Sequence, residues 1–223
     1  MELKEYPDRD MAIISLAGTL ASGLRRLLAG TDRVSFAVPG GTTPAPVFDV
    51  LSAADLDWSR VTVMLTDERW VPTSSARSNA ALVKKHLLQG HAAAAGFIPF
   101  YKEGLTPQEA AETLSDAYQA HFPLSLVLLG MGADMHTASL FPQAPGVEAA
   151  LARDATPLCA VTPPDQPEQR ITLSARVLDE ALEKHVVIFG QDKRDALENA
   201  RGRAPVDAPI NAVIQGGTVH WAA

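Results

Sequence analysis

One stretch constrains the fold of this chain more than any other: residues 124–142, L-S-L-V-L-L-G-M-G-A-D-M-H-T-A-S-L-F-P. Its uncharged, apolar beginning is typical of a strand that is buried on both faces of a parallel sheet. Gly130 and Gly132 then permit a sharp turn or the close approach of a ligand. Asp134 and His136 follow at the carboxyl end of this strand, where open α/β sheets bind ligands. We therefore expect the rest of the chain to bring further groups to this edge.

Short apolar segments alternate with helical segments along the rest of the chain. Further strands are expected at 34–38, 61–65, 97–100, 158–161, 170–173, 185–189 and 218–221. Helices are expected from about residue 11 to the basic pair at 25–26, at 44–51, 79–86, 107–122 and 174–182, and up to residue 200. This alternation predicts one α/β domain over residues 1–223, with three layers: a mostly parallel twisted sheet and helices on both of its faces.

Polar residues mark the expected beginnings of several helices. Thr106 and Glu109, with Pro107 between them, have the spacing of a capping box. Thr43 precedes Pro44 and is a candidate N-cap, and Ser174 is another.

Composition excludes several classes of protein. A net charge of −7 argues against nucleic acid or an anionic membrane as the main partner, so an anionic substrate needs a local basic pocket. Cys159 is the only cysteine, which excludes an internal disulfide and favours the cytoplasm. The first ten residues are acidic and the apolar stretch 11–24 is broken by polar residues and glycine. We therefore expect neither a targeting segment nor a membrane span.

A glycine-rich turn and three cations are candidates for binding an anion. Residues 40–43, G-G-T-T, join a strand to a helix, where free backbone N–H groups and the helix dipole attract anions. The turn lacks the lysine of a Walker A loop, and a tight turn without a ligand is the alternative. Arg69 and Lys193 follow strands and Arg170 begins one. They are either solvated loop residues or a phosphate clamp.

Other chemistries receive little support from the sequence. The 6 histidines show no spacing typical of a metal site, and one cysteine cannot form a thiolate site, so no metal is expected. Residues 130–135 only superficially resemble a dinucleotide-binding motif, because Met135 replaces its third glycine. Ser139 lacks the flanking glycines of a nucleophile elbow. A lone histidine is most often structural, but the place of His136 beside Asp134 after a glycine-rich strand exit favours catalysis.

Taken together, these segments resemble the 6-phosphogluconolactonase family. The resemblance rests on residues 38–44, on 66–72 with Ser78 and Asn79 downstream, on 130–142, and on 170–173 with Lys193. Each piece is short, but their order and spacing are specific. The resemblance implies the sugar-phosphate isomerase/deaminase-like fold. It also implies hydrolysis of 6-phospho-D-glucono-1,5-lactone to 6-phospho-D-gluconate in the pentose phosphate pathway, without a cofactor or metal.

Roles for individual residues follow from the resemblance. His136 is the expected general base and acid on water, Asp134 orients it, and Arg69 or backbone N–H groups stabilise the oxyanion. The implied partner is a small phosphosugar lactone, for a monomer or small homo-oligomer. The expected substrate- and phosphate-binding residues are Gly40, Gly41, Thr42, Thr43, Asp67, Asn79, Gly132, Arg170 and Lys193.

One departure and two alternatives accompany this prediction. The family usually has glycine before the histidine, and Met135 at this position would be strained if its φ is positive. A glucosamine-6-phosphate deaminase shares the fold, but deaminases resembling this chain carry Tyr where Arg69 stands. A non-catalytic sugar-phosphate sensor is the other alternative, although the sequence shows no basic helix-turn-helix segment.

Overall fold

The larger sheet is entirely parallel. The computed structural model describes residues 1–164 and 166–223. Each neighbouring pair of strands in this 7-stranded sheet runs in the same direction, as the sequence predicts. In spatial order the strands are β1 (Glu2–Glu5), β10 (Thr218–Ala222), β9 (Glu183–Phe189), β6 (Leu126–Gly130), β2 (Val34–Val38), β3 (Val61–Leu65) and β5 (Gly96–Ile98).

The direction of winding reverses between β2 and β6. From β2 the chain adds β3 and β5 on one side, and then returns to add β6, β9 and β10 on the other. The central pair is in register through Phe36 with Leu126 and Ala37 with Val127, and none of these four side chains is exposed. Because β2 and β6 are parallel, the turns that follow them emerge at the same edge. This is the topological switch point, where a crevice forms in open α/β sheets.

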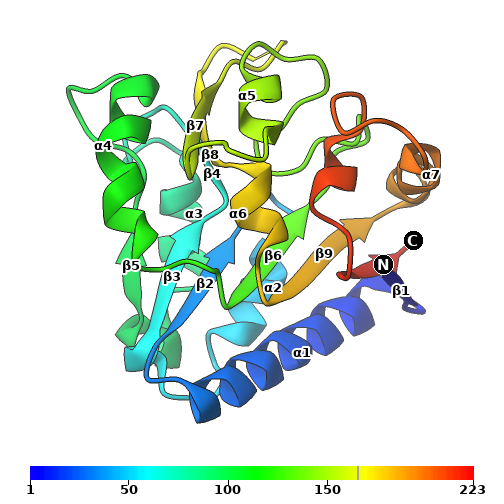
Figure 1. Ribbon diagram of the computed structural model, residues 1–223. Helices are drawn as coiled ribbons and strands as arrows, with labels where there is room; N and C mark the ends of the chain where they lie inside the picture. Colours follow the sequence, from blue (N-terminus) through cyan, green and yellow to red (C-terminus); the bar gives the residue numbers. More distant parts are fainter. Residues whose placement is uncertain (165) are drawn as a thin grey trace.

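Helices cover both faces of the larger sheet. α1 packs against α2, β2 and β10, and α2 packs against α3. Figure 1 shows α6 in front of the sheet and α2 behind it. The helices are α1 (Arg9–Gly30), α2 (Ala45–Leu51), α3 (Asn79–His86), α4 (Pro107–Gln119), α5 (Val147–Leu151), α6 (Ala175–Asp179) and α7 (Gln191–Ala200), with short 3-10 turns η1 (Trp58–Arg60), η2 (Gly90–Ala94) and η3 (Pro209–Ala212).

α1 is longer than the apolar run 11–24 suggests. By length and composition alone it is apolar enough to cross a membrane. In the structure Leu16, Leu20 and Leu24 are fully buried and belong to the hydrophobic core. One face of α1 therefore packs like a core helix.

Of the three predicted helix caps, one is confirmed. Thr106 and Glu109 form the capping box at the start of α4. The prediction for Thr43 is wrong: α2 begins after Pro44 without a side-chain cap, and Pro46 in its first turn has no N–H to donate. Ser174 occupies the N-cap position of α6 but makes no capping hydrogen bond.

A second, antiparallel sheet is a correction to the predicted architecture. The strands expected at 158–161 and 170–173 exist with those bounds, as β7 (Leu158–Val161) and β8 (Arg170–Leu173). They pair with each other and with β4 (Asp67–Arg69), apart from the parallel sheet. Figure 1 shows this 3-stranded sheet above the carboxyl ends of the larger one, so it forms one wall over the crevice. β1 and α5 are also absent from the sequence prediction.

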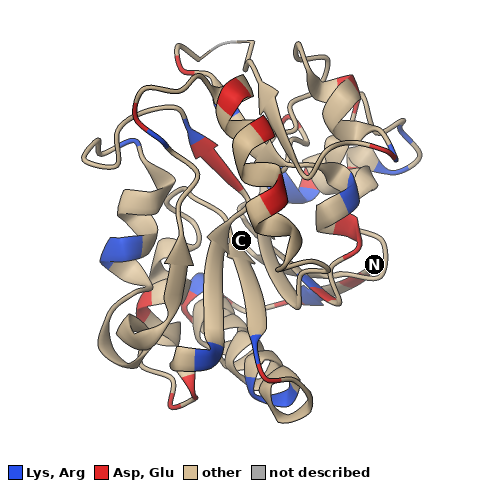
Figure 2. Cartoon of the chain, turned by 60° about the vertical axis from the view of Figure 1, so that its left-hand side comes forward, with Lys and Arg blue, Asp and Glu red and all other residues tan. Residues whose placement is uncertain are grey.

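Charge is distributed unevenly between the two sheets. Figure 2 shows the central strands of the larger sheet as uncharged, whereas β4 is acidic with a basic end. All three residues of β4 are charged: Asp67, Glu68 and Arg69. A strand of this composition is expected only where its charges have specific partners.

A buried polar chain connects β9, β10 and the segment after β1. The Tyr6 hydroxyl lies 2.8 Å from His220 Nδ1, and His220 Nε2 lies 3.0 Å from His185 Nδ1. His185 Nε2 in turn lies 3.0 Å from Glu183 Oε1. Burial, followed by the positive charges of His185 and Lys4, lowers the pKa of His220 from 6.5 to about 3. His220 is therefore neutral in the folded protein.

This pKa predicts a loss of stability in acid. Below about pH 6.5 the unfolded chain binds a proton that folded His220 excludes, so the free energy of unfolding falls as the pH drops from there toward 3. Between pH 7 and pH 5 this contributes about 2 kcal/mol. Urea unfolding at both pH values measures it, with His220→Gln as a non-titrating comparison. The wild type should lose more stability than the variant over this interval, and equal losses would contradict the assignment.

Candidate active site

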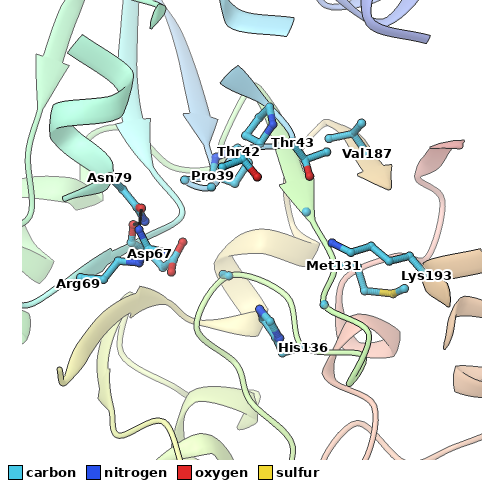
Figure 3. A pocket seen from close by; sticks show the side chains of 16 residues that line it. Pro39, Thr42, Thr43, Asp67, Arg69, Asn79, Met131, His136, Val187 and Lys193 are labelled. Carbon is cyan, nitrogen blue, oxygen red and sulfur yellow. Dashed lines mark hydrogen bonds between the residues drawn. The ribbon is translucent and has the colours of Figure 1, made fainter. Parts of the chain in front are cut away.

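A pocket of about 250 Å³ lies at the switch point between β2 and β6. Figure 3 shows Arg69, Asp67 and Asn79 on one side, Lys193 on another, and His136 facing the space between them. The structure therefore brings together groups that are far apart in the sequence. The predicted site residues that line the pocket are Gly40, Gly41, Thr42, Thr43, Asp67, Arg69, Asn79, Gly132, His136 and Lys193.

His136 forms a close pair with Asp134, which lies behind it and does not line the pocket. His136 Nδ1 is 2.5 Å from Asp134 Oδ1, which also accepts the backbone N–H of His136 at 3.2 Å. Partial burial acts to raise the pKa of Asp134, but the hydrogen bonds and charge of His136 outweigh it and lower the pKa. An ionised carboxylate only accepts hydrogen bonds, so Nδ1 carries a proton, and Nε2 is left as an acceptor whenever the ring is neutral.

The loop that carries this pair has an unusual backbone. Met135 has φ of 70°, so the condition under which methionine would be strained at this position is met. Gly132 donates its N–H to His136 O at 2.9 Å and accepts from Met135 N–H at 3.0 Å. A Cβ at position 132 would lie 2.2 Å from His136 Nδ1 and 2.4 Å from Asp134 Oδ1. Glycine is thus required for the close approach of the His–Asp pair.

Arg69 and Asn79 form the opposite side of the pocket. Arg69 Nη1 donates to Asn79 Oδ1 at 2.7 Å, and Asn79 Nδ2 donates to the backbone oxygen of Asp67 at 2.8 Å. The side chain of Asn79 also packs against the turn after β2, because a Cβ on Gly40 would lie 1.8 Å from Asn79 Oδ1. Both ends of this amide are occupied. Asn79 therefore positions Arg69 and the glycine turn relative to each other.

Asp67 links this side of the pocket to the His136 loop. Its Oδ2 accepts a hydrogen bond from Ser139 Oγ at 2.6 Å, and its Oδ1 accepts one from Thr66 Oγ1 at 3.2 Å. Ser139 is fully buried, and its backbone N–H donates to Thr172 Oγ1 of β8 at 3.3 Å. The sequence around Ser139 bears only on a nucleophilic role, which the missing flanking glycines disfavour. Its role as a link between loop and strand has no local sequence signal.

The predicted cation clamp is only partly assembled. Lys193, near the start of α7, is half-buried and points its amino group into the pocket (Figure 3). Within residues 1–164 and 166–223 it has no ion-pair partner. Together with Arg69 it gives the acidic protein a pocket with two cations against the one carboxylate of Asp67.

Arg170 does not line this pocket, so the structure does not bring it together with the other residues of the predicted clamp. As the first residue of β8 it pairs with Arg69 across the antiparallel sheet, and the sheet and neighbouring segments bury it. It donates to Gln166, while Nε and Nη1 have no partner among the described residues. Burial first, and then the charge of Arg69, lowers the pKa of Arg170. Its charge acts from behind Arg69.

The turn at residues 40–43 offers donors to the pocket. In the parts of the chain that the structure describes, the backbone N–H groups of Gly41, Thr42 and Thr43 donate to no protein acceptor. Gly41 has φ of 94°, a conformation that favours glycine. α2 is short, so these N–H groups and the threonine hydroxyls are stronger candidates for anion binding than a helix dipole. The described residues contain no cluster of three or more His, Cys, Asp or Glu suited to a metal ion.

Fold and site define an α/β protein with a ligand pocket at the switch point of a parallel sheet. The family model described as Glucosamine-6-phosphate isomerases/6-phosphogluconolactonase matches residues 7–221, and the chain belongs to this family. It is 42% identical to 6-phosphogluconolactonase of Pseudomonas aeruginosa, over 92% of this chain and 88% of that protein. It is 41% identical to 6-phosphogluconolactonase of Mesorhizobium japonicum, over 97% of this chain and 93% of the relative.

Solved structures agree with this placement. The crystal structure of a 6-phosphogluconolactonase from Shewanella baltica matches with a TM-score of 0.95 and 32% identity, over 100% of this chain and 98% of that one. A putative 6-phosphogluconolactonase from Neisseria gonorrhoeae gives a TM-score of 0.93 and 33% identity, over 100% of both chains. The fold implied by the resemblance is confirmed.

The glycine contact at position 132 gives a direct test of the site. Gly132→Ala should displace the His136–Asp134 pair, because the added methyl cannot fit, and should reduce turnover by roughly 100-fold or more. Gly18→Ala is the control, since Gly18 is exposed in α1, does not line the pocket, and a Cβ there meets nothing within 4 Å. Steady-state kinetics and circular dichroism of both variants measure the effect. A folded Gly132→Ala variant with turnover equal to that of Gly18→Ala would contradict the placement of the pair.

Proposed function

We propose that this chain hydrolyses 6-phospho-D-glucono-1,5-lactone to 6-phospho-D-gluconate in the pentose phosphate pathway. The observation that carries the proposal is that the His136–Asp134 pair, Arg69, Lys193 and the turn at 40–43 surround one pocket. The names of the relatives support the same activity. We further propose a cytoplasmic monomer or small homo-oligomer that needs no metal or cofactor and acts on a small molecule alone.

The phosphate is assigned to the side of the pocket that offers positive charge and N–H donors. Thr42 and Thr43 supply hydroxyl and backbone N–H groups, and Lys193 supplies an ammonium group that has no protein carboxylate to neutralise it among the described residues. Charge-assisted hydrogen bonds of this kind are among the strongest in proteins. Arg170 adds to the positive potential from its buried position behind Arg69.

The lactone carbonyl then lies toward His136. Nε2 of the neutral ring takes a proton from water as the water oxygen bonds to the carbonyl carbon, and the carbonyl electron pair moves to oxygen. When the tetrahedral intermediate collapses, the bond to the ring oxygen breaks and the imidazolium returns its proton to that oxygen. Asp134, which keeps its charge, stabilises the imidazolium and fixes the ring orientation.

Arg69 is the assigned partner of the developing oxyanion. The N–H of Gly132, another candidate, is already donated to the backbone oxygen of His136. Arg69 is held by Asn79 and the backbone oxygen of Arg77, so its guanidinium is preorganised before substrate binds. Asp67, fixed by Ser139, is assigned to a substrate hydroxyl.

The catalytic role of His136 is tested by replacing it with asparagine. His136→Asn cannot exchange a proton with water, so the enzymatic rate should fall roughly 10²–10⁴-fold while binding of 6-phospho-D-gluconate persists. The assay follows acid release from freshly made lactone and subtracts spontaneous opening. Near-normal turnover in the variant would remove His136 from the mechanism.

The phosphate assignment is tested by a second variant and a second substrate. Lys193→Met should raise KM for the phosphorylated lactone roughly 10-fold to 100-fold, with a smaller effect on kcat, because it removes a charged contact present throughout the reaction. The wild type should hydrolyse unphosphorylated D-glucono-1,5-lactone poorly, and Lys193→Met should hydrolyse it at the same rate. Arg194→Met is the matched control, since Arg194 lies next in the chain but pairs with Glu5 outside the pocket. Equal KM values for Lys193→Met and wild type would exclude this phosphate site.

A further inference from the structure

Glu68 is a fully buried acid that is not among the predicted site residues. It is the middle residue of the charged strand β4, with 0% of its surface exposed. Its Oε1 accepts the backbone N–H groups of Arg69 and Asn79, each at 2.7 Å. Its Oε2 accepts Ser78 Oγ at 2.9 Å and the backbone N–H of Ala80 at 2.8 Å. One carboxylate therefore joins β4 to the beginning of α3.

The environment of Glu68 suits only an acceptor. Burial raises the pKa of Glu68, while the hydrogen bonds from Ala80, Asn79, Ser78 and Arg69 act in the opposite direction. Three of these donors are backbone N–H groups, which cannot reverse their role. A side chain without two acceptor oxygens would leave some of these donors buried and without a hydrogen-bond partner, which lowers stability.

The two oxygens of Glu68 serve different parts of the molecule. Oε2 contacts Ser78 and Ala80, which do not line the pocket and belong to the cap of α3. Oε1 contacts Arg69 and Asn79, which both line the pocket and whose side chains meet at 2.7 Å. The oxygen on the pocket side thus fixes the two backbone positions from which the Arg69–Asn79 contact is built.

We propose that Glu68 is a positioning residue for lactone hydrolysis, holding Arg69 and Asn79 so that the guanidinium meets the developing oxyanion. This inference rests on the proposed function. Glu68 touches no substrate, and its effect passes through Arg69. Glu68 differs from a simple helix cap, because loss of Glu68 should lower kcat/KM more than loss of Ser78, the N-cap of α3.

Three single variants separate these roles. Glu68→Ala removes both oxygens and should lower kcat/KM roughly 10-fold to 100-fold, mainly through kcat. Glu68→Gln can keep its one oxygen on Arg69 and Asn79, while its amide group donates to the Ser78 hydroxyl and leaves the backbone N–H of Ala80 unpaired. The cost of that unpaired donor falls on stability at the α3 cap, so most of kcat should be rescued. Ser78→Ala is the control for capping and should retain most activity despite lower stability. If Glu68→Ala does not fold, Glu68→Asp replaces it, since its shorter carboxylate cannot reach both β4 and α3.

A double-mutant cycle tests whether Glu68 acts through Arg69. In an Arg69→Met background the Glu68→Ala substitution should change kcat/KM by less than about threefold, because the group it positions is gone. An undiminished effect in that background, a Glu68→Ala variant as active as wild type, or an equal loss in Ser78→Ala would each overturn the proposal. Wild-type turnover of the lactone is measured first and tests the proposed function by itself. Its absence would reject that function, whereas a normal wild type with an active Glu68→Ala variant rejects only the role of Glu68.

Discussion

The parallel pairing of β2 with β6 is the constraint on which the rest of the structure depends. β2 and β6 are far apart in the chain. They pair through Phe36 with Leu126 and through Ala37 with Val127. Their apolar side chains are wholly buried, so a shift of register would cost a large part of the central core. The pairing sends the glycine turn after β2 and the Asp134–His136 loop after β6 to one edge. The turn proposed to bind the phosphate and the histidine proposed to transfer the proton thereby become neighbours.

Short polar links then fix the segments around this edge relative to one another. Ser139 connects the His136 loop to Asp67, and Asn79 connects Arg69 to the turn at Gly40. Each link ties a loop to a strand or helix terminus of the scaffold, which limits movement of the groups that face the pocket. The strained backbone at Met135 persists in this setting because the surrounding hydrogen bonds of Gly132 and His136 determine it.

Local sequence patterns predict the elements of the parallel sheet well, and they fail where long-range pairing decides. β2 and β3 of the parallel sheet, and β7 and β8 outside it, have the predicted bounds because apolar and β-branched residues dominate each of these short segments. The same pattern cannot tell which sheet a strand joins, so the antiparallel sheet was missed, and with it the burial of Arg170 behind Arg69. Lys193 and His136 line one pocket, as expected for residues that follow parallel strands, because the carboxyl ends of such strands share one edge. Glu68 and Ser139 could not be assigned, since their roles consist of contacts across 10 and 72 positions.

The central claim is that one phosphosugar lies between the glycine turn and His136. A crystal structure of the protein with the product 6-phospho-D-gluconate tests it most directly. We predict the phosphate on Thr42, Thr43 and Lys193, and the new carboxylate within about 3 Å of His136 Nε2 and the guanidinium of Arg69. A product bound in the opposite direction, with its phosphate on His136, or bound at another surface of the protein would contradict it.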